Sequence, residues 1–399
     1  MTADEARRGR WAVAAMFGAN GMTMGAWAPQ IPELLPTHGI DESTLGLLIL
    51  GLGIGAVGAM LFAGRLIARP GSVPMVKLFA ALSVFSLPLV VFAPNLWTLA
   101  PAMAVFGGVL GVMDVSINAN AVEIERRLGR AIMSSSHGFW SLGGFVGGSA
   151  GSWLLVQTSR EIQALTAAVA FIVLLALAWR FLKGEAPQPA QLAGAPRARL
   201  LPRVWGLWLL GAMALFSMVP EGSVLDWGAL YIREELGGDA FRAGLGFAFF
   251  AGAMALMRFL GDGVRNRFGA VNTLRVSGLI GMAGLLVAAV ATSPVIAIIG
   301  FALAGLGVAN MIPVIFSAAG NYPGLPPGAG ISAVSMVGYA GILIAPASIG
   351  FVAEHFGYRP TYVALGLVLA VISALAHVCA RADAIAAAPA KAVPANAAG

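Results

Sequence analysis

The chain has 399 residues, of which 59% are hydrophobic and 11% are charged, and its formal net charge is +6. An ordinary soluble domain carries about 25% charged residues, so a soluble protein this apolar could not cover its own surface. The composition therefore predicts a membrane protein. The basic residues are spread between apolar runs, which argues against a nucleic-acid partner, and the single cysteine, Cys379, excludes an internal disulfide and a cysteine-built metal site.

Apolar stretches long enough to cross a bilayer, which takes about 20 mostly apolar residues, follow one another along the whole chain. They lie at about 11–33, 44–66, 75–93, 97–122, 132–155, 163–182, 204–230, 243–261, 271–291, 293–318, 329–352 and 359–380. We predict an all-α membrane protein whose twelve transmembrane helices form two pseudo-symmetric bundles of six.

A segment rich in proline and basic residues separates the sixth helix from the seventh and contains no apolar run, which indicates a linker. We therefore expect an N-terminal bundle at 1–182, a cytoplasmic linker at 183–203 and a C-terminal bundle at 204–380. The alanine-rich end of the chain, 381–399, is expected to be a disordered tail.

The positions of the basic residues predict the orientation. With a cytoplasmic N-terminus, only four of the 24 lysine and arginine residues fall on the external side, which leaves 20 on the cytoplasmic side. Such a bias satisfies the positive-inside rule, so both termini are expected in the cytoplasm. The four external residues are Arg160, Arg233, Arg242 and Arg359.

Short motifs recur in the two halves. The segment GRLIARPG at Gly64–Gly71 joins the second and third helices, and VRNRFG at 264–269 occupies the equivalent place in the second half. Likewise LGVMD, ending at Asp114, corresponds to LGVAN, ending at Asn310. Repeated six-helix halves are typical of secondary transporters, in which the solute binds between the halves near the midplane of the bilayer.

From about residue 11 to 380 the chain resembles a major facilitator superfamily transporter. The loop signature of that superfamily, glycine-x-leucine-x-aspartate-arginine-x-glycine, appears at Gly64–Gly71 with Ala68 in place of the aspartate. The fourth helix is similar to that of fucose–proton symporters, which carry an acidic residue followed four positions later by asparagine, as Asp114 and Asn118 do here. The pair Pro29–Gln30 also matches them, whereas the position of their second coupling carboxylate is Gly25.

The segments SSSHGFW at 134–140 and EGSVLDW at 221–227 resemble an uncharacterised bacterial branch near those permeases. The resemblance implies a monomeric protein of the bacterial inner membrane that moves a small polar solute by alternating access, with proton-coupled symport. Its partners would be the solute, protons and the lipid bilayer.

Asp114 lies about 14 residues after Ala100, near which the apolar part of the predicted fourth helix begins, and so near the middle of the bilayer. A carboxylate there is expensive and usually functional, so we assign proton coupling to Asp114, with a structural hydrogen bond between helices as the alternative. His137, one turn into the fifth helix, is a possible protonatable partner or a packing residue. Asn118 and Asn310 are expected either to contact solute or to join helices.

The candidate solute site also contains Glu221, Trp140 and Gln30. Glu221 stands beside Pro220 and Gly222, which should weaken the seventh helix, and broken helices tend to line cavities. Trp140 could stack on a sugar ring or serve as packing. The predicted solute-binding residues are Gln30, Asn118, Glu221, Asn310 and Trp140.

Two groups of charges are expected to be structural. Arg258 and Asp262, four residues apart on one helix face, should form an ion pair. The charges around Glu125 should form a solvated cytoplasmic turn.

The sequence contains no Walker loop, GxSxG elbow, HExxH or CxxC in a suitable setting, which argues against an ATP-driven pump and an enzyme. We expect neither a cofactor nor a metal ion. Two alternatives to symport remain: proton-coupled efflux of a drug or metabolite, and a membrane sensor or scaffold that does not transport. Gly144, in place of the fifth-helix proline of drug–proton antiporters, argues against efflux.

Overall fold

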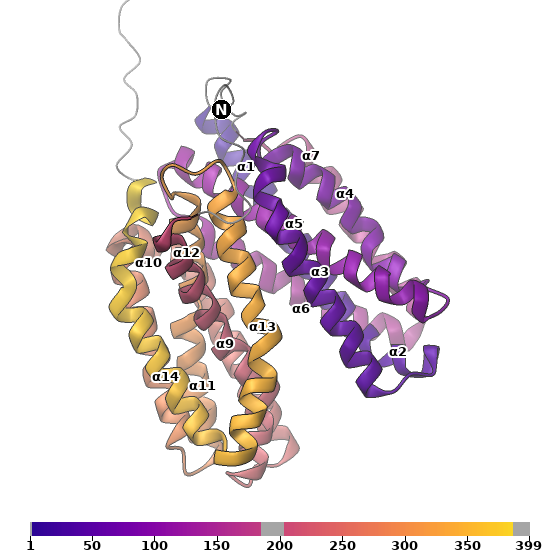
Figure 1. The fold of residues 1–399 in the computed structure, drawn as a ribbon, viewed down its shortest axis with the longest axis vertical. Helices are drawn as coiled ribbons and strands as arrows, with labels where there is room; N and C mark the ends of the chain where they lie inside the picture. Colours follow the sequence, from indigo (N-terminus) through magenta and orange to yellow (C-terminus); the bar gives the residue numbers. More distant parts are fainter. Residues whose placement is uncertain (1, 185–202, 386–399) are drawn as a thin grey trace, which may run out of the picture.

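The computed structural model describes residues 2–184 and 203–385, and these fold into helices (Figure 1). The first half contains α1 (Ala3–Trp27), α2 (Gln30–His38), α3 (Glu42–Ala68), α4 (Ser72–Val91), α5 (Leu96–Leu128), α6 (Met133–Gln157) and α7 (Arg160–Trp179). The second half contains α9 (Trp205–Glu234), α10 (Ala240–Ala289), α11 (Pro294–Val308), α12 (Met311–Gly320), α13 (Ala329–Phe356), α14 (Tyr358–Ala374) and the 3₁₀ helix η1 (Leu375–Ile385).

Most of the predicted linker, 183–203, and most of the predicted tail, 381–399, lie outside the described residues. Residues 381–385 do not belong to a disordered tail, because they form the end of η1.

The helices account for twelve membrane crossings within the described ranges. Eight stretches have the length and hydropathy of a span, and one of them, Leu245–Ala289, holds two helices. The break inside α10 is at Gly269, whose φ of 79° and ψ of 163° are not helical. The remaining crossings are α1, α6 and α13, with 25, 25 and 28 residues. At 1.5 Å per residue each is longer than the hydrocarbon core of about 30 Å. The fold class predicted from the sequence is confirmed.

Glycines let neighbouring helices in the first half touch backbone to backbone. A Cβ atom at Gly21 of α1 would lie 2.0 Å from the carbonyl oxygen of Trp140 in α6, and one at Gly147 of α6 would lie 2.1 Å from that of Met22. In the same way, a Cβ atom at Gly107 of α5 would lie 2.0 Å from the carbonyl oxygen of Leu52 in α3. The part of α5 around Gly107, two turns before Asp114, is therefore in close contact with α3.

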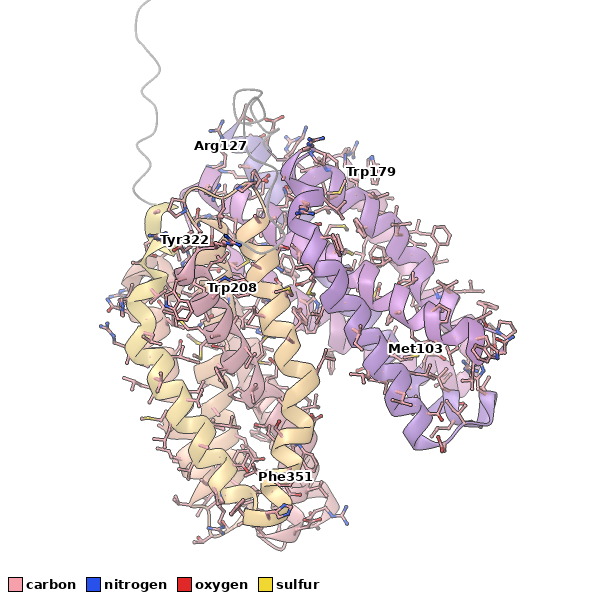
Figure 2. The ribbon with its side chains drawn as sticks, viewed as in Figure 1. Met103, Arg127, Trp179, Trp208, Tyr322 and Phe351 are labelled. Carbon is pink, nitrogen blue, oxygen red and sulfur yellow. The ribbon has the colours of Figure 1, made fainter. Side chains whose placement is uncertain are left out.

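Figure 1 shows the two groups of helices meeting at the end that carries the N-terminus and diverging toward the other end, where α2 lies on one arm and the α13–α14 turn on the other. In Figure 2, Arg127 marks the closed end, and Met103 and Phe351 lie on the two diverging arms. The halves touch chiefly through α3 with α13 and α6 with α10. The Ser332 hydroxyl of α13, for example, donates to the Met60 carbonyl oxygen of α3 at 2.5 Å.

Candidate functional site

Asp114 of α5 and Tyr339 of α13 face one another across the two halves. Asp114 is 5% exposed and lies 14 residues before the end of α5, about 21 Å along the helix. Its carboxyl group lies close enough to the hydroxyl of Tyr339 for the two to interact. Its second oxygen, Oδ2, has no hydrogen-bond partner in the described part of the chain. One carboxyl group thus contacts both halves and keeps an acceptor available.

Asn118 connects Asp114 to His137. The Asn118 side-chain nitrogen donates to the main-chain oxygen of Asp114 at 2.9 Å, and its Oδ1 lies 3.2 Å from Nε2 of His137. The imidazole packs against Phe17 and Phe316, with ring centroids 5.2 and 5.9 Å away. The sequence analysis offered His137 as a possible protonatable partner of Asp114, and the structure links the two residues through Asn118.

Trp140 is held by Asn20, a residue that the sequence analysis missed. The indole nitrogen of Trp140 donates to Oδ1 of Asn20 at 2.9 Å. Asn20 is 3% exposed, and its amide nitrogen reaches the carbonyl oxygen of Leu110 at 3.4 Å, one turn before Asp114. A lone asparagine in the middle of the first apolar helix was the available signal.

The predicted ion pair between Arg258 and Asp262 is wrong. Arg258 of α10 instead lies 3.5 Å from Oε2 of Glu221 in α9, and it also donates to the Ser141 hydroxyl of α6. Asp262 accepts the main-chain N–H groups of Ser134 and Ser135, at 2.9 and 3.2 Å. These N–H groups begin α6, where a helix has no internal acceptors for them, and the side chain at the N-cap position, Ile132, does not bond them. Asp262 therefore bonds the start of α6 and does not pair with Arg258.

The expected weakness of the seventh helix is also wrong, because α9 runs without a break through Pro220. The interruption lies between α11 and α12, at Asn310, whose φ is −99° and ψ is 0°. Asn310 is fully buried, neither polar atom of its side chain has a hydrogen-bond partner among the described residues, and it packs on Gly261 of α10. Asn310 therefore packs against α10 of its own half.

Gln30 lies at the start of α2 and joins α2 to α7. Its amide nitrogen donates to the carbonyl oxygen of Arg160 at 3.0 Å and to Oε1 of Gln163 at 2.5 Å, and its oxygen accepts from Arg160 at 3.3 Å. Among the described residues, no hydrogen bond joins the side chain of Gln30 or Asn310 to the other predicted residues. The structure does bring together a group that we call the central cluster: Asp114, Asn118, His137, Glu221, Arg258 and Tyr339.

Comparison with known proteins decides the family. The family model described as Major Facilitator Superfamily matches residues 13–324 and 227–397. The chain belongs to the major facilitator superfamily. An uncharacterised MFS-type transporter of Yersinia pestis is 36% identical over 368 residues, which cover 92% of this chain and 94% of that protein. An uncharacterised transporter of Sinorhizobium fredii is 33% identical, covering 92% of this chain and 97% of its own length. The membrane protein MosC of Rhizobium meliloti is 32% identical, covering 91% and 88%.

Solved superfamily structures share the fold. The fucose:proton symporter FucP of E. coli superposes with a TM-score of 0.75 at 18% identity, covering 92% of this chain and 97% of that one. The proton:xylose symporter XylE gives a TM-score of 0.71 at 11% identity, covering 94% and 96%. The protein is thus a multi-pass membrane protein of a transporter superfamily.

In this superfamily member a buried ion pair joins the halves at the closed end, where the sequence indicated a solvated turn. Glu125 of α5 is fully buried, and its Oε1 lies 2.8 Å from Arg265 of α10. Ser317 of α12 bonds both side chains, and the Ile132 N–H donates to the Glu125 carboxylate at 3.0 Å. The expectation for Glu125 is wrong because its partner comes from the other half. A charged, hydrogen-bonded layer therefore joins the two halves at the closed end.

Proposed function

We propose that the protein imports a small polar solute across the bacterial inner membrane by alternating access, in symport with protons, and that it acts as a monomer with both termini in the cytoplasm. The observation that carries the proposal is the contact between Asp114 and Tyr339, which places a buried carboxyl group where the two halves meet. Intramembrane carboxyl groups are costly and mark ion and substrate paths, and superfamily solutes bind between the repeats.

The chemistry of the carboxyl group supplies the coupling. When Asp114 is ionised, closing the halves around it removes its charge from water. No cation in the described part of the chain is bonded to this carboxylate, so the free-energy cost of burying its charge is high. A proton on Oδ1 or Oδ2 removes the charge, so the loaded protein passes through the occluded state more readily. Asn118 orients the main chain at Asp114, and His137 extends the polar path toward α6.

The deciding experiment uses purified protein in proteoliposomes. A thermal-shift screen against sugars, organic acids and drugs identifies a ligand, since a ligand stabilises the state that it binds. Asp114→Asn, which imitates the protonated form, should retain binding and counterflow exchange but lose accumulation driven by a pH gradient. Asp226→Asn, at an exposed carboxyl group of α9, is the matched control and should accumulate solute normally.

If Asp114→Asn accumulates solute in response to a pH gradient at wild-type rates, this carboxyl group is not the site of proton coupling. Solute movement out of the vesicles against its gradient, in exchange for protons, would favour the efflux alternative. Ligand binding with no flux in either direction would favour a sensor.

A further inference from the structure

Arg258 is a buried cation with unused donors in the middle of the membrane span. Its side chain is 8% exposed, and it lies 11 residues before Gly269, about 16 Å along α10. A guanidinium group carries five N–H donors. One nitrogen donates to Ser141 and one faces Glu221, but Nε is buried without a hydrogen-bond partner in the described part of the chain.

The carboxylate that faces this cation holds it loosely. Oε2 of Glu221 is 3.5 Å from the guanidinium, and the Glu221 side chain is 36% exposed, whereas that of Arg258 is nearly covered. An arginine–carboxylate pair that is fully formed is usually bidentate, with distances of about 2.7–2.9 Å. The charge of Arg258 is therefore only partly neutralised. Of the two side chains, that of Glu221 is the more accessible.

We propose that Arg258 binds a carboxylate group of the transported solute, which takes the place of Glu221. This inference rests on the proposed function and names the class of solute for the same site. The planar fork of the guanidinium fits two carboxylate oxygens, as it uses Nε and one terminal nitrogen together. The hydroxyl of Ser141 and the side chains of Asn118 and His137 supply neutral polar partners for the rest of a small hydrophilic acid.

The charges in the central cluster favour a single carboxylate over a phosphate group. Arg258 is the one arginine or lysine of this cluster, and it already faces Glu221. A dianionic phosphate would leave the site with a large excess of negative charge. With Asp114 and Glu221 ionised, a monocarboxylate leaves two excess negative charges, whereas a dianionic phosphate leaves three. Protons on these two carboxyl groups balance the smaller excess, so an acid entering this site is expected to bring protons with it.

The first test is a thermal-shift assay of the full-length protein with three acids and their neutral counterparts at matched ionic strength. The pairs are D-glucuronate with D-glucose, D-gluconate with D-glucitol, and L-lactate with propane-1,2-diol, and D-glucose 6-phosphate tests the phosphate. At least one acid should raise the melting temperature while its neutral counterpart does not. Stabilisation by none of the acids, by a neutral compound equally, or by the sugar phosphate alone overturns the proposal.

The second test uses variants whose effects on the dissociation constant of the stabilising acid have opposite signs. Arg258→Gln should weaken binding at least tenfold, and Arg258→Lys less, whereas Glu221→Gln should strengthen it several-fold because it removes the competing carboxylate. Arg242→Gln, at an exposed arginine of the same helix, is the matched control. Wild-type binding by Arg258→Gln, or weaker binding by Glu221→Gln, contradicts the proposal. If Arg258→Gln does not fold, Arg258→Lys and Glu221→Gln carry the test.

The two proposals fail separately. If a neutral solute binds and is accumulated through Asp114, the proposed function stands and the carboxylate site falls. If an acid binds through Arg258 but no proton gradient drives it, the carboxylate site stands and the symport falls.

Discussion

The hydroxyl of Tyr339 and the carboxyl group of Asp114 face one another from opposite halves of the molecule. In the alternating access proposed above, rocking of one half against the other would move these residues apart, so their contact would belong to only part of a transport cycle. Protonation of the carboxyl group gives it a donor in addition to its acceptors. In that proposal the pair connects a proton to the relative position of the halves.

Tyr339→Phe removes the hydroxyl that faces Asp114 while keeping the aromatic ring. We expect pH-driven accumulation to fall severalfold, and the free energy of unfolding to fall by about 1 kcal/mol, the usual net value of one hydrogen bond. The matched control is Tyr362→Phe, because the Tyr362 hydroxyl is buried without a partner among the described residues and its loss should be neutral or stabilising. Equal transport losses in the two variants would show that the hydroxyl of Tyr339 has no special role.

Removal of one partner of the buried pair Glu125–Arg265 should be worse than removal of both. Arg265→Met leaves a buried, unpaired carboxylate, which costs about 3–5 kcal/mol, whereas an apolar replacement of both partners is often nearly neutral. We therefore expect Glu125→Leu with Arg265→Met to melt at a higher temperature than Arg265→Met alone. In the same double variant the two halves should separate at the closed end more often, because the ion pair that joins them there is lost. A double variant that melts below both single variants would argue against this account.

Neighbouring glycines of α6 should respond very differently to alanine. Gly147→Ala brings a methyl group to 2.1 Å from the Met22 carbonyl oxygen, whereas the same change at Gly148 meets its first neighbour, the Gly25 carbonyl oxygen, at an ordinary 3.6 Å. Overpacking costs about 1–3 kcal/mol where side chains can adjust, and backbone adjusts less easily. Folded yield and melting temperature in detergent should therefore drop for Gly147→Ala and change little for Gly148→Ala. Similar losses at both positions would mean that the helices are not this close.

The predicted topology can be tested by labelling single cysteines in intact cells. Cys379 is fully buried and should not react with a membrane-impermeant maleimide. Glu234 and Arg130 are exposed near opposite ends of the molecule, so Glu234→Cys should label from outside and Arg130→Cys only after the membrane is permeabilised. Labelling with the reverse pattern would invert the orientation inferred from the positive charges.

The fold was largely predictable because its signals are local. Apolar runs predicted every crossing, and the break between the eighth and ninth helices occurs at Gly269, inside the expected gap. The main deviation is at the start of α1, which begins at Ala3 rather than near residue 11. There Thr2 and Glu5 form a capping box, which satisfies main-chain N–H groups before the apolar run begins.

The site was predictable only where its residues share a helix. The spacing of Asp114 and Asn118 on α5 follows from helical geometry alone. Glu125 and Arg265 are 140 residues apart, and Arg258 and Glu221 lie on different helices, so composition and spacing do not reveal either pair. Tyr339 was missed because an aromatic residue in an apolar helix looks like packing until its partner is known.

The close contact of α1 with α6 also limits how this protein can change. A Cβ atom at Gly25 would lie 2.1 Å from the carbonyl oxygen of Gly144 and 2.7 Å from the main-chain nitrogen of Gly148. This is the position at which the fucose–proton symporters that the sequence resembles carry their second carboxylate. No acidic side chain fits there, because α6 backbone fills the space. An acidic residue at position 25 would therefore force α1 and α6 apart along their whole glycine contact.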